Sequence, residues 1–181
     1  MILSLIQPLD QSVTDFFFHL QTPFLNKIFL MITSFGNWQG IIVAVTLVCI
    51  YWIVKKKYSW VVSFLLTLLA SEGSVSLIKH VIARPRPMLV AVYQENSFSF
   101  PSGHATIAVT FYGFLLFLFW KQLRKKTRMI LLATYLLWVF LIGLSRIYLG
   151  VHYVSDVFAG YILGSIWLLI GIYSTKKIGS L

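Results

Sequence analysis

Apolar residues form long runs separated by short polar stretches. Five of these runs approach the length of about 20 residues that an α-helix needs to cross the hydrocarbon of a bilayer. They cover roughly residues 38–54, 59–81, 102–120, 129–146 and 152–175. A weaker candidate, roughly 12–34, contains Asp15, Pro23 and Lys27, so we expect it to be kinked, partly interfacial or divided into two short helices. The pattern predicts an all-α bundle of six transmembrane helices, formed by a single domain over residues 1–181.

The longest interruption of this pattern is the loop 83–101. Pro85, Pro87 and Pro101 exclude a continuous helix there, because proline removes a backbone donor and clashes with the preceding turn. We expect the aromatic residues of the loop to pack near the functional site or to form a lid over it.

Composition agrees with a membrane protein. Hydrophobic residues make up 59% of the chain and charged residues only 11%, whereas roughly a quarter of a typical soluble domain is charged. The net charge of +10 raises the question of nucleic-acid binding. The cations, however, lie in short clusters between apolar runs and form no basic face, so we exclude nucleic acid and expect membrane lipids as partners. No obligate protein partner is indicated.

The distribution of the cations also predicts orientation. Lysine and arginine are enriched in cytoplasmic loops of membrane proteins. With six alternating spans, ten cations fall on one side, which we assign to the cytoplasm together with both termini of a multi-pass plasma-membrane protein: Lys55, Lys56, Lys57, Lys121, Arg124, Lys125, Lys126, Arg128, Lys176 and Lys177. The outer side holds four cations that break this trend: Lys79, Arg84, Arg86 and Arg146.

Several polar residues on that outer side are suited to binding phosphate. Arginine offers a planar fork to phosphate oxygens and lysine a point charge, so Lys79, Arg86 and Arg146 supply three cations. Two predicted helices begin on the same side, and their free N–H groups attract anions. Ser102 can cap a helix or donate to an anion, and Gly103 permits close backbone approach. Together these residues favour a compact dianion.

Two histidines add chemistry to the cations. His152 and Asp156 are four residues apart and share one face of a helix, so the carboxylate can fix the imidazole tautomer and leave the other nitrogen free as a nucleophile. His104 comes from another helix and can act as general acid and then general base. With three cations these residues form a phosphoryl-transfer site that needs neither a metal nor a cofactor.

Three motifs in order resemble the signatures of the type 2 phosphatidic acid phosphatase superfamily: Lys79-x6-Arg86-Pro87, Pro101-Ser102-Gly103-His104 and Ser145-Arg146-x5-His152-x3-Asp156. The resemblance implies a six-helix membrane fold with an active site at the outer face and no metal. It also implies a phosphohistidine on His152, supported by Asp156, with His104 as acid and base. Lys79, Arg86, Ser102, Gly103 and Arg146 would then bind the substrate phosphate.

The short chain is similar to bacterial members of that superfamily that hydrolyse phosphatidylglycerophosphate to phosphatidylglycerol, and this is the activity we expect. Undecaprenyl pyrophosphate is the alternative lipid, because it presents a terminal phosphate to the same cations. A non-hydrolytic phosphate or lipid carrier is the alternative from another class. A carrier would need the cations but no aligned histidine and aspartate, and it would favour inverted repeats with broken helices.

Other polar residues fit no signature position. We expect Arg84 and His80 to be solvated or to face lipid headgroups. Glu72 lies within a predicted span, where a carboxylate is costly, so it is either protonated and structural or helps to hold the site. Small residues permit close helix packing in membranes, which is the role expected of four glycines: Gly143, Gly150, Gly160 and Gly164.

Overall fold

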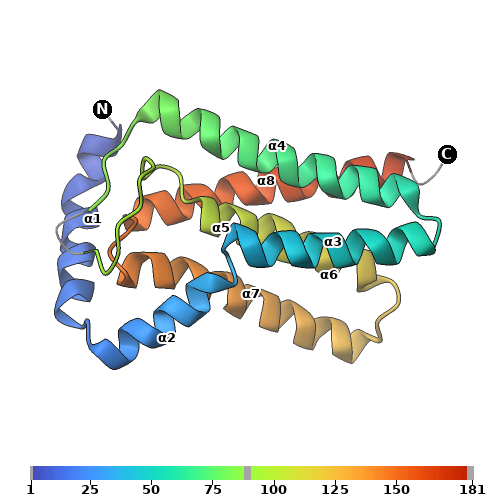
Figure 1. Cartoon of the computed structure of the whole chain (residues 1–181), viewed down its shortest axis with the longest axis horizontal. Helices are drawn as coiled ribbons and strands as arrows, with labels where there is room; N and C mark the ends of the chain where they lie inside the picture. Colours follow the sequence, from blue (N-terminus) through green and yellow to red (C-terminus); the bar gives the residue numbers. More distant parts are fainter. Residues whose placement is uncertain (1, 88–90, 179–181) are drawn as a thin grey trace.

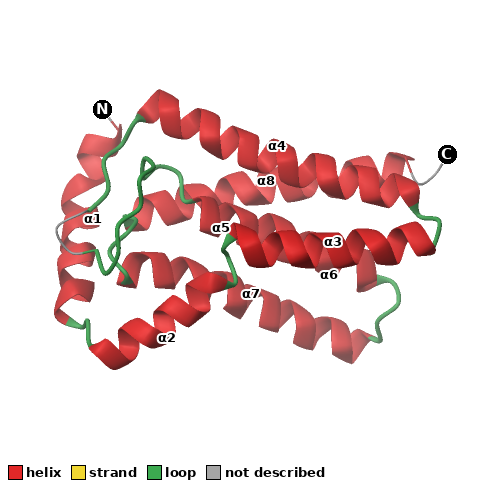
Figure 2. Cartoon of the chain, viewed as in Figure 1, coloured by secondary structure: helices red, strands yellow, loops and turns green. Residues whose placement is uncertain are grey.

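The computed structural model describes residues 2–87 and 91–178, a part of the chain that contains helices and loops but no strand (Figure 2). The helices are α1 (Ile2–His19), α2 (Pro23–Ser34), α3 (Trp38–Val54), α4 (Tyr58–Ile82), α5 (Gly103–Ile107), α6 (Gly113–Trp120), α7 (Lys125–Tyr148) and α8 (Val154–Ile178). A π-helical turn, Ala108–Tyr112, joins α5 and α6 into one rod. The all-α prediction is therefore confirmed.

Most of the predicted apolar runs match these helices closely. The run 38–54 coincides with α3, 59–81 with α4, and 102–120 with the rod formed by α5 and α6. The run 129–146 lies within α7, which begins four residues earlier, at Lys125, and the run 152–175 matches α8 to within three residues at each end. Helices α4, α7 and α8 and the rod of α5 and α6 each have the length and apolarity needed to cross a membrane, and α3 has them as part of the longer segment Pro23–Val54.

The N-terminal region differs from a single span over 12–34. The helix breaks at Leu20–Thr22, where Pro23 cannot donate a backbone hydrogen bond and occupies the first position of α2. The Thr22 side chain caps this new helix by accepting from the N–H of Leu25 at 3.2 Å. Helix α1 turns across one end of the bundle, while the long helices run along it (Figure 1). The alternative of two short helices is the one that the structure shows.

This break affects the number of candidate spans. Helices α2 and α3 run in the same general direction and together make one bent pass, so five candidate spans are found in the described chain, the first over Pro23–Val54. The first and last helices end at opposite ends of the long axis in Figure 1. The six-helix prediction is thus confirmed as far as five or six candidate membrane helices, and the side of the membrane on which each terminus lies stays a prediction.

Helix α8 is the central element of the bundle and packs closely against the rod that starts with α5. A Cβ atom built at Gly160 would lie 2.6 Å from the backbone oxygen of Ser102, and one at Gly164 would lie 2.6 Å from that of Thr106. Both glycines are thus required for close packing, as predicted. The contact fixes the start of α5, which carries the Ser102–His104 motif, against α8.

The outer surface of the long helices is rich in large apolar residues. Leu69 on α4 is 68% exposed and Leu169 on α8 is 66% exposed. Contiguous apolar surface of this kind is unusual in soluble proteins and suits a lipid environment. Together with five helices of spanning length, it identifies a multi-pass membrane protein.

Candidate active site

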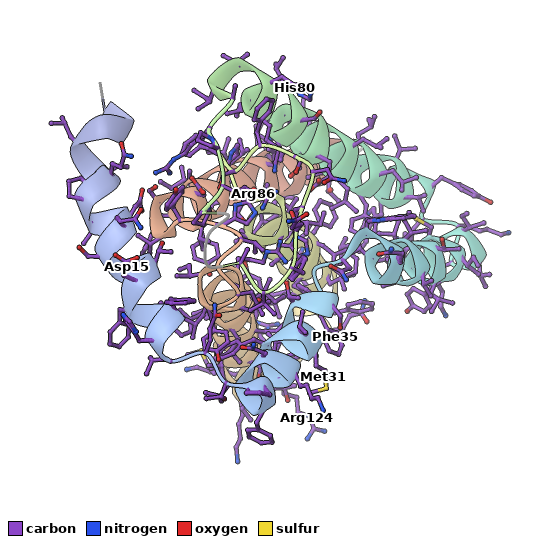
Figure 3. The ribbon with its side chains drawn as sticks, turned by 60° about the vertical axis from the view of Figure 1, so that its left-hand side comes forward. Asp15, Met31, Phe35, His80, Arg86 and Arg124 are labelled. Atoms are coloured by element: carbon purple, nitrogen blue, oxygen red, sulfur yellow. The ribbon has the colours of Figure 1, made fainter. Side chains whose placement is uncertain are left out.

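The described parts of the loop, residues 83–87 and 91–101, lie at the end of the bundle that is crossed by α1 (Figure 1). At this end α4 and α7 finish, and α5 and α8 begin. In Figure 3 Arg86 lies among the helices beneath the loop, whereas His80 points outward from α4 and Asp15 lies at the edge on α1. All eight predicted site residues occupy this end, as helix alternation required: Lys79, Arg86, Ser102, Gly103, His104, Arg146, His152 and Asp156.

The geometry defines the tautomer of His152, which is 1% exposed. Its Nε2 atom lies 3.1 Å from Nη1 of Arg86. A guanidinium group can only donate, so Nε2 accepts and carries the lone pair, while Nδ1 carries the proton. Burial lowers the pKa of His152 well below its usual value, and the nearby Arg146 and Arg86 charges lower it further. The imidazole is therefore neutral, with Nε2 available as a nucleophile.

Asp156 approaches the other side of this imidazole. Its Oδ2 atom is 3.6 Å from His152 Nδ1, which is too long for a direct hydrogen bond. The Ser99 hydroxyl lies beside both, donating to Asp156 Oδ2 at 2.5 Å and lying 3.4 Å from His152 Nδ1. The predicted pair is thus brought together, but in this state Ser99 binds the carboxylate oxygen that faces the imidazole. Nothing in the three motifs indicated Ser99.

Two of the predicted phosphate-binding cations hold an internal carboxylate. Glu95, from the loop, forms an ion pair with Arg86 at 2.7 Å and another with the fully buried Arg146. Burial alone would raise the pKa of Glu95, but the two guanidinium groups outweigh it and lower this pKa to about 2. An ionised carboxylate therefore lies between two arginines next to His152. Sequence reasoning did not predict this, although Glu95 is one of only five acidic residues in the chain.

The remaining donors of these cations are directed by the surrounding elements. Arg146 donates to the hydroxyl groups of Thr33 at 2.7 Å and Tyr93 at 2.5 Å. Among the described residues its buried Nε–H has no hydrogen-bond partner. Lys79 donates to the backbone oxygen of Phe98 at 2.5 Å. The cations are therefore held in place by loop and helix contacts and keep one donor free for a ligand.

The start of α5 contributes polar groups from the opposite side. Ser102 is fully buried, and its Oγ atom accepts from the N–H of Ala105 at 3.4 Å, so it caps the helix as predicted. A Cβ atom at Gly103 would meet nothing closer than 3.6 Å. Protein packing therefore does not require a glycine there, and a requirement for one would have to come from a ligand.

His104 lies between this helix start and the bend that joins α2 to α3. Its Nε2 atom is 2.8 Å from Oδ1 of Asn37. A Cβ atom at Gly36 would lie 2.8 Å from the imidazole, so this glycine makes room for the ring. His104 and Glu72 both line a groove of about 520 Å³ between α3, α4 and α5, which is otherwise mainly apolar. Glu72 thus lies at the edge of the site, 3.9 Å from a Cβ atom built at Gly103, in a groove whose walls include lipid-facing residues such as Leu69.

Arg84 does not have the solvated position that we expected. It is 8% exposed and forms ion pairs with Asp10 at 2.7 Å and with Asp156 at 2.6 Å. The expectation was wrong because Asp10, 74 positions away, is brought to Arg84 by α1.

In the described chain, no group of three or more histidine, cysteine, aspartate or glutamate residues is placed to hold a metal ion.

Comparison with known proteins agrees with this geometry. The family model described as the PAP2 superfamily matches residues 60–180. Phosphatidylglycerophosphatase B of Bacillus subtilis is 29% identical over 163 residues, covering 88% of this chain and 79% of that protein. Undecaprenyl-diphosphatase of Sulfolobus acidocaldarius is 28% identical over 159 residues, covering 80% of this chain and 67% of that protein.

A solved structure is also similar over nearly the whole chain. The crystal structure of a transmembrane PAP2 type phosphatidylglycerolphosphate phosphatase from Bacillus subtilis has a TM-score of 0.89 and 27% identity, and the match covers 96% of this chain and 88% of that one. Family, helical architecture and the clustering of the motif residues therefore agree. The chain belongs to the PAP2 superfamily and is a membrane phosphatase.

Proposed function

We propose that the protein hydrolyses the terminal phosphate of phosphatidylglycerophosphate, with His152 as the nucleophile. One observation carries this proposal. The neutral Nε2 atom of buried His152 lies beside Arg86, and Arg86 and Arg146 together bind an anion, the Glu95 carboxylate. A phosphate that replaced this carboxylate would meet two arginines and a nucleophilic nitrogen at once. The named activity of the relatives with phosphatidylglycerophosphate supports this lipid as the substrate.

The reaction proceeds in two displacements. His152 Nε2 attacks phosphorus, an N–P bond forms, and the bond from phosphorus to the lipid oxygen breaks as His104 donates a proton to that oxygen. Water then attacks phosphorus, its proton passes to His104, and the N–P bond breaks to release inorganic phosphate. In the first step Nδ1 of His152 keeps its proton, and the positive imidazole is stabilised by Asp156.

The chain's own cations stabilise the charge that spreads over the phosphoryl oxygens. Preorganised donors aimed at such oxygens commonly contribute a factor of about 100 to 1,000 each. Arg86 approaches from the loop, Arg146 from the end of α7 and Lys79 from the end of α4. Ser102 and the backbone at Gly103 contact the phosphate from the start of α5. These assignments require no metal ion.

The groove beside His104 is suited to the apolar part of the substrate. Its walls include Ile41 and Val45 from α3 and Leu65 and Leu69 from α4. It begins at the residue that we assign as proton donor to the departing lipid oxygen. The leaving group would therefore have its chain in the groove while its phosphate stays among the cations.

Orientation follows from the basic clusters. The turns after α3 and α6 and the end of α8 carry Lys55–Lys57, Lys121–Arg128 and Lys176–Lys177, and they lie opposite the site end (Figure 1). We assign the basic end to the cytoplasm and the site, with α1, to the outer face of the plasma membrane.

Cysteine labelling tests this orientation. In a Cys49→Ser background, Asn96→Cys and Gln11→Cys should react with a membrane-impermeant maleimide on intact cells, and Gln122→Cys should not. Labelling of Gln122→Cys alone would overturn the assignment.

Undecaprenyl pyrophosphate remains the second candidate substrate, and the similarity to an undecaprenyl-diphosphatase favours it. Its terminal phosphate would use the same cations. The apolar lining of the groove would suit a prenyl chain as well as an acyl chain.

Phosphate release by purified protein tests both candidates. The panel contains phosphatidylglycerophosphate, phosphatidic acid, undecaprenyl pyrophosphate and a soluble phosphate ester, each with and without EDTA. We expect the highest kcat/KM on phosphatidylglycerophosphate, no effect of EDTA, and complete loss in His152→Ala but not in His19→Ala, a matched change at an exposed histidine on α1. Full activity of His152→Ala would refute the nucleophile, and loss of activity in EDTA would refute the metal-free mechanism.

A further inference from the structure

Helix α1 carries a carboxylate into the site end of the bundle. Asp10 is 1% exposed, and α1 lies outside the segment that matches the family model. Its Oδ1 atom accepts from the N–H of Ser155 at 3.0 Å. Its Oδ2 atom accepts from the Ser155 hydroxyl at 2.5 Å and from Arg84 at 2.7 Å. Burying a carboxylate this completely costs free energy of desolvation unless both its oxygens are hydrogen-bonded, so its position calls for a functional explanation.

Arg84 connects this carboxylate to Asp156. Its Nη2 atom donates to Asp10, and its Nη1 atom donates to Asp156 Oδ1 at 2.6 Å and to the Ser155 hydroxyl at 2.8 Å. The guanidinium group also lies over the ring of Tyr153, 4.1 Å from its centroid. Both terminal nitrogens and one face of the group are therefore held, which restricts the position of the arginine.

The consequence is a fixed orientation of the Asp156 carboxylate. Arg84 binds only Oδ1, while Oδ2 faces His152 and accepts from Ser99 and from the N–H of Tyr153 at 3.0 Å. Without Arg84 the carboxylate could rotate about its last bond. Asp10 neutralises the added cation, so that the negative charge of Asp156 stays available to the imidazole.

A purely stabilising role explains this arrangement poorly. Replacing a buried ion-pair triad by apolar residues is commonly neutral or stabilising, because the charges must be desolvated. The triad lies directly behind the histidine that attacks phosphorus, which is where a fixed charge would affect the reaction.

We propose that Arg84 is a positioning residue that holds Asp156 toward His152, and that Asp10 of α1 holds Arg84. The proposal rests on the proposed function, because it assigns Arg84 a role through the nucleophile His152. Arg84 does not bind the substrate phosphate, since both its terminal nitrogens are already bound to carboxylates. Helix α1 thus contributes to the active site through Asp10.

Kinetic analysis of variants tests this role, with thermal unfolding measured on each. Arg84→Gln should lower kcat roughly 100-fold, as expected for a catalytic group displaced by about an ångström. KM and inhibition by vanadate should stay within about twofold of wild type, because the phosphate-binding cations are unchanged. Arg84→Lys should recover part of kcat, since lysine keeps the charge but loses the fork.

Asp10→Asn gives a second, nearly isosteric variant in case Arg84→Gln does not fold. It should lower kcat about tenfold, the lower end of the range for groups that orient another residue of an active site through a hydrogen bond. Asp15→Asn, the same change at an exposed position of α1, should leave kcat unchanged. Wild-type kcat in both Asp10→Asn and Arg84→Gln would overturn the proposal, as would a loss that appears only as weaker vanadate inhibition. If the wild-type protein releases no phosphate from any lipid, the proposed function has failed instead.

Discussion

The two ends of the bundle bury different kinds of side chain. At the basic end and through the middle, the core consists of large apolar residues, among them Trp52, Phe64 and Phe114. At the other end Arg146, His152 and Asp156 are at most 1% exposed. Both regions are as closed to solvent as a protein interior, yet one is held by packing and the other by hydrogen bonds and ion pairs.

This difference decides what a substitution will change. Apolar packing is not directional, so the loss of one side chain lowers stability in proportion to the void that remains. Hydrogen-bonded charges depend on the positions of particular atoms, and an unpaired buried charge is strongly unfavourable. The apolar half should therefore determine stability, and the polar end should determine chemistry.

Arg146→Lys should lower kcat/KM about 1,000-fold, because losing a preorganised donor to a developing charge commonly costs a factor of 100 to 1,000. Lysine keeps the charge but cannot reach Thr33, Tyr93 and the phosphate together. Phosphate release measures the effect. Arg128→Lys, the same change at the basic end, serves as control, and equal losses in both variants would contradict the division.

Phe64→Ala should lower the free energy of unfolding by about 3 kcal/mol, the scale of a phenylalanine lost from a close-packed core. Phe64 is 0% exposed, so its removal leaves a void. Thermal unfolding in detergent measures the change, and kcat of the folded protein should be unaltered. Phe140→Ala, at a position 55% exposed on α7, is the matched control. A fall in kcat without loss of stability would show that the apolar half also controls catalysis.

Glu95→Gln should strengthen inhibition by inorganic phosphate or vanadate roughly tenfold, because the carboxylate that competes for Arg86 and Arg146 loses its charge. The inhibition constant is the measurement. Asn96→Ala, at the next position of the same loop, should leave it unchanged. Weaker inhibition in Glu95→Gln would mean that Glu95 organises the arginines for the anion instead of competing with it.

The rate of phosphoenzyme formation should be nearly the same at pH 5.5 as at pH 7. The pKa of His152 is held well below its usual value by burial and by Arg146 and Arg86, so Nε2 stays unprotonated. This step is measured by mixing the enzyme with phosphate-labelled substrate, stopping the reaction rapidly without acid and counting the label bound to the enzyme. An enzyme whose nucleophilic histidine had an ordinary pKa near 6.5 would lose activity about tenfold at pH 5.5.

The same depressed pKa affects stability. Since His152 binds a proton more readily in the unfolded chain than in the folded one, the free energy of unfolding should decline as the pH falls below about 6.5.

The sequence predicted much of the fold because apolar runs of bilayer length leave few other structures. The helices α3, α4, α7 and α8 were placed within a few residues. The same alternation of helices brought Lys79, His104 and His152 to one end of the bundle. The 12–34 segment left three alternatives open, because its composition does not reveal that the chain turns across the bundle at Pro23.

The partners within the site could not be predicted in the same way. Arg84 and Arg86 are neighbours in one dipeptide repeat, and nothing in the sequence indicates that one binds Asp10 and the other Glu95. Such pairs depend on where α1 and the 83–101 loop come to lie. The scarcity of acids was the usable signal, since three of the five acidic residues in this chain form the ion pairs of the site: Asp10, Glu95 and Asp156.

By itself, the sequence determined the class of molecule and the residues that carry its chemistry, because hydrophobic length and motif spacing are local properties of the chain. Only the tertiary structure decided the path of α1, the tautomer of His152 and the anion held by Arg86 and Arg146. These depend on contacts between segments far apart in sequence. A buried charge takes its role from the partner that packing places beside it.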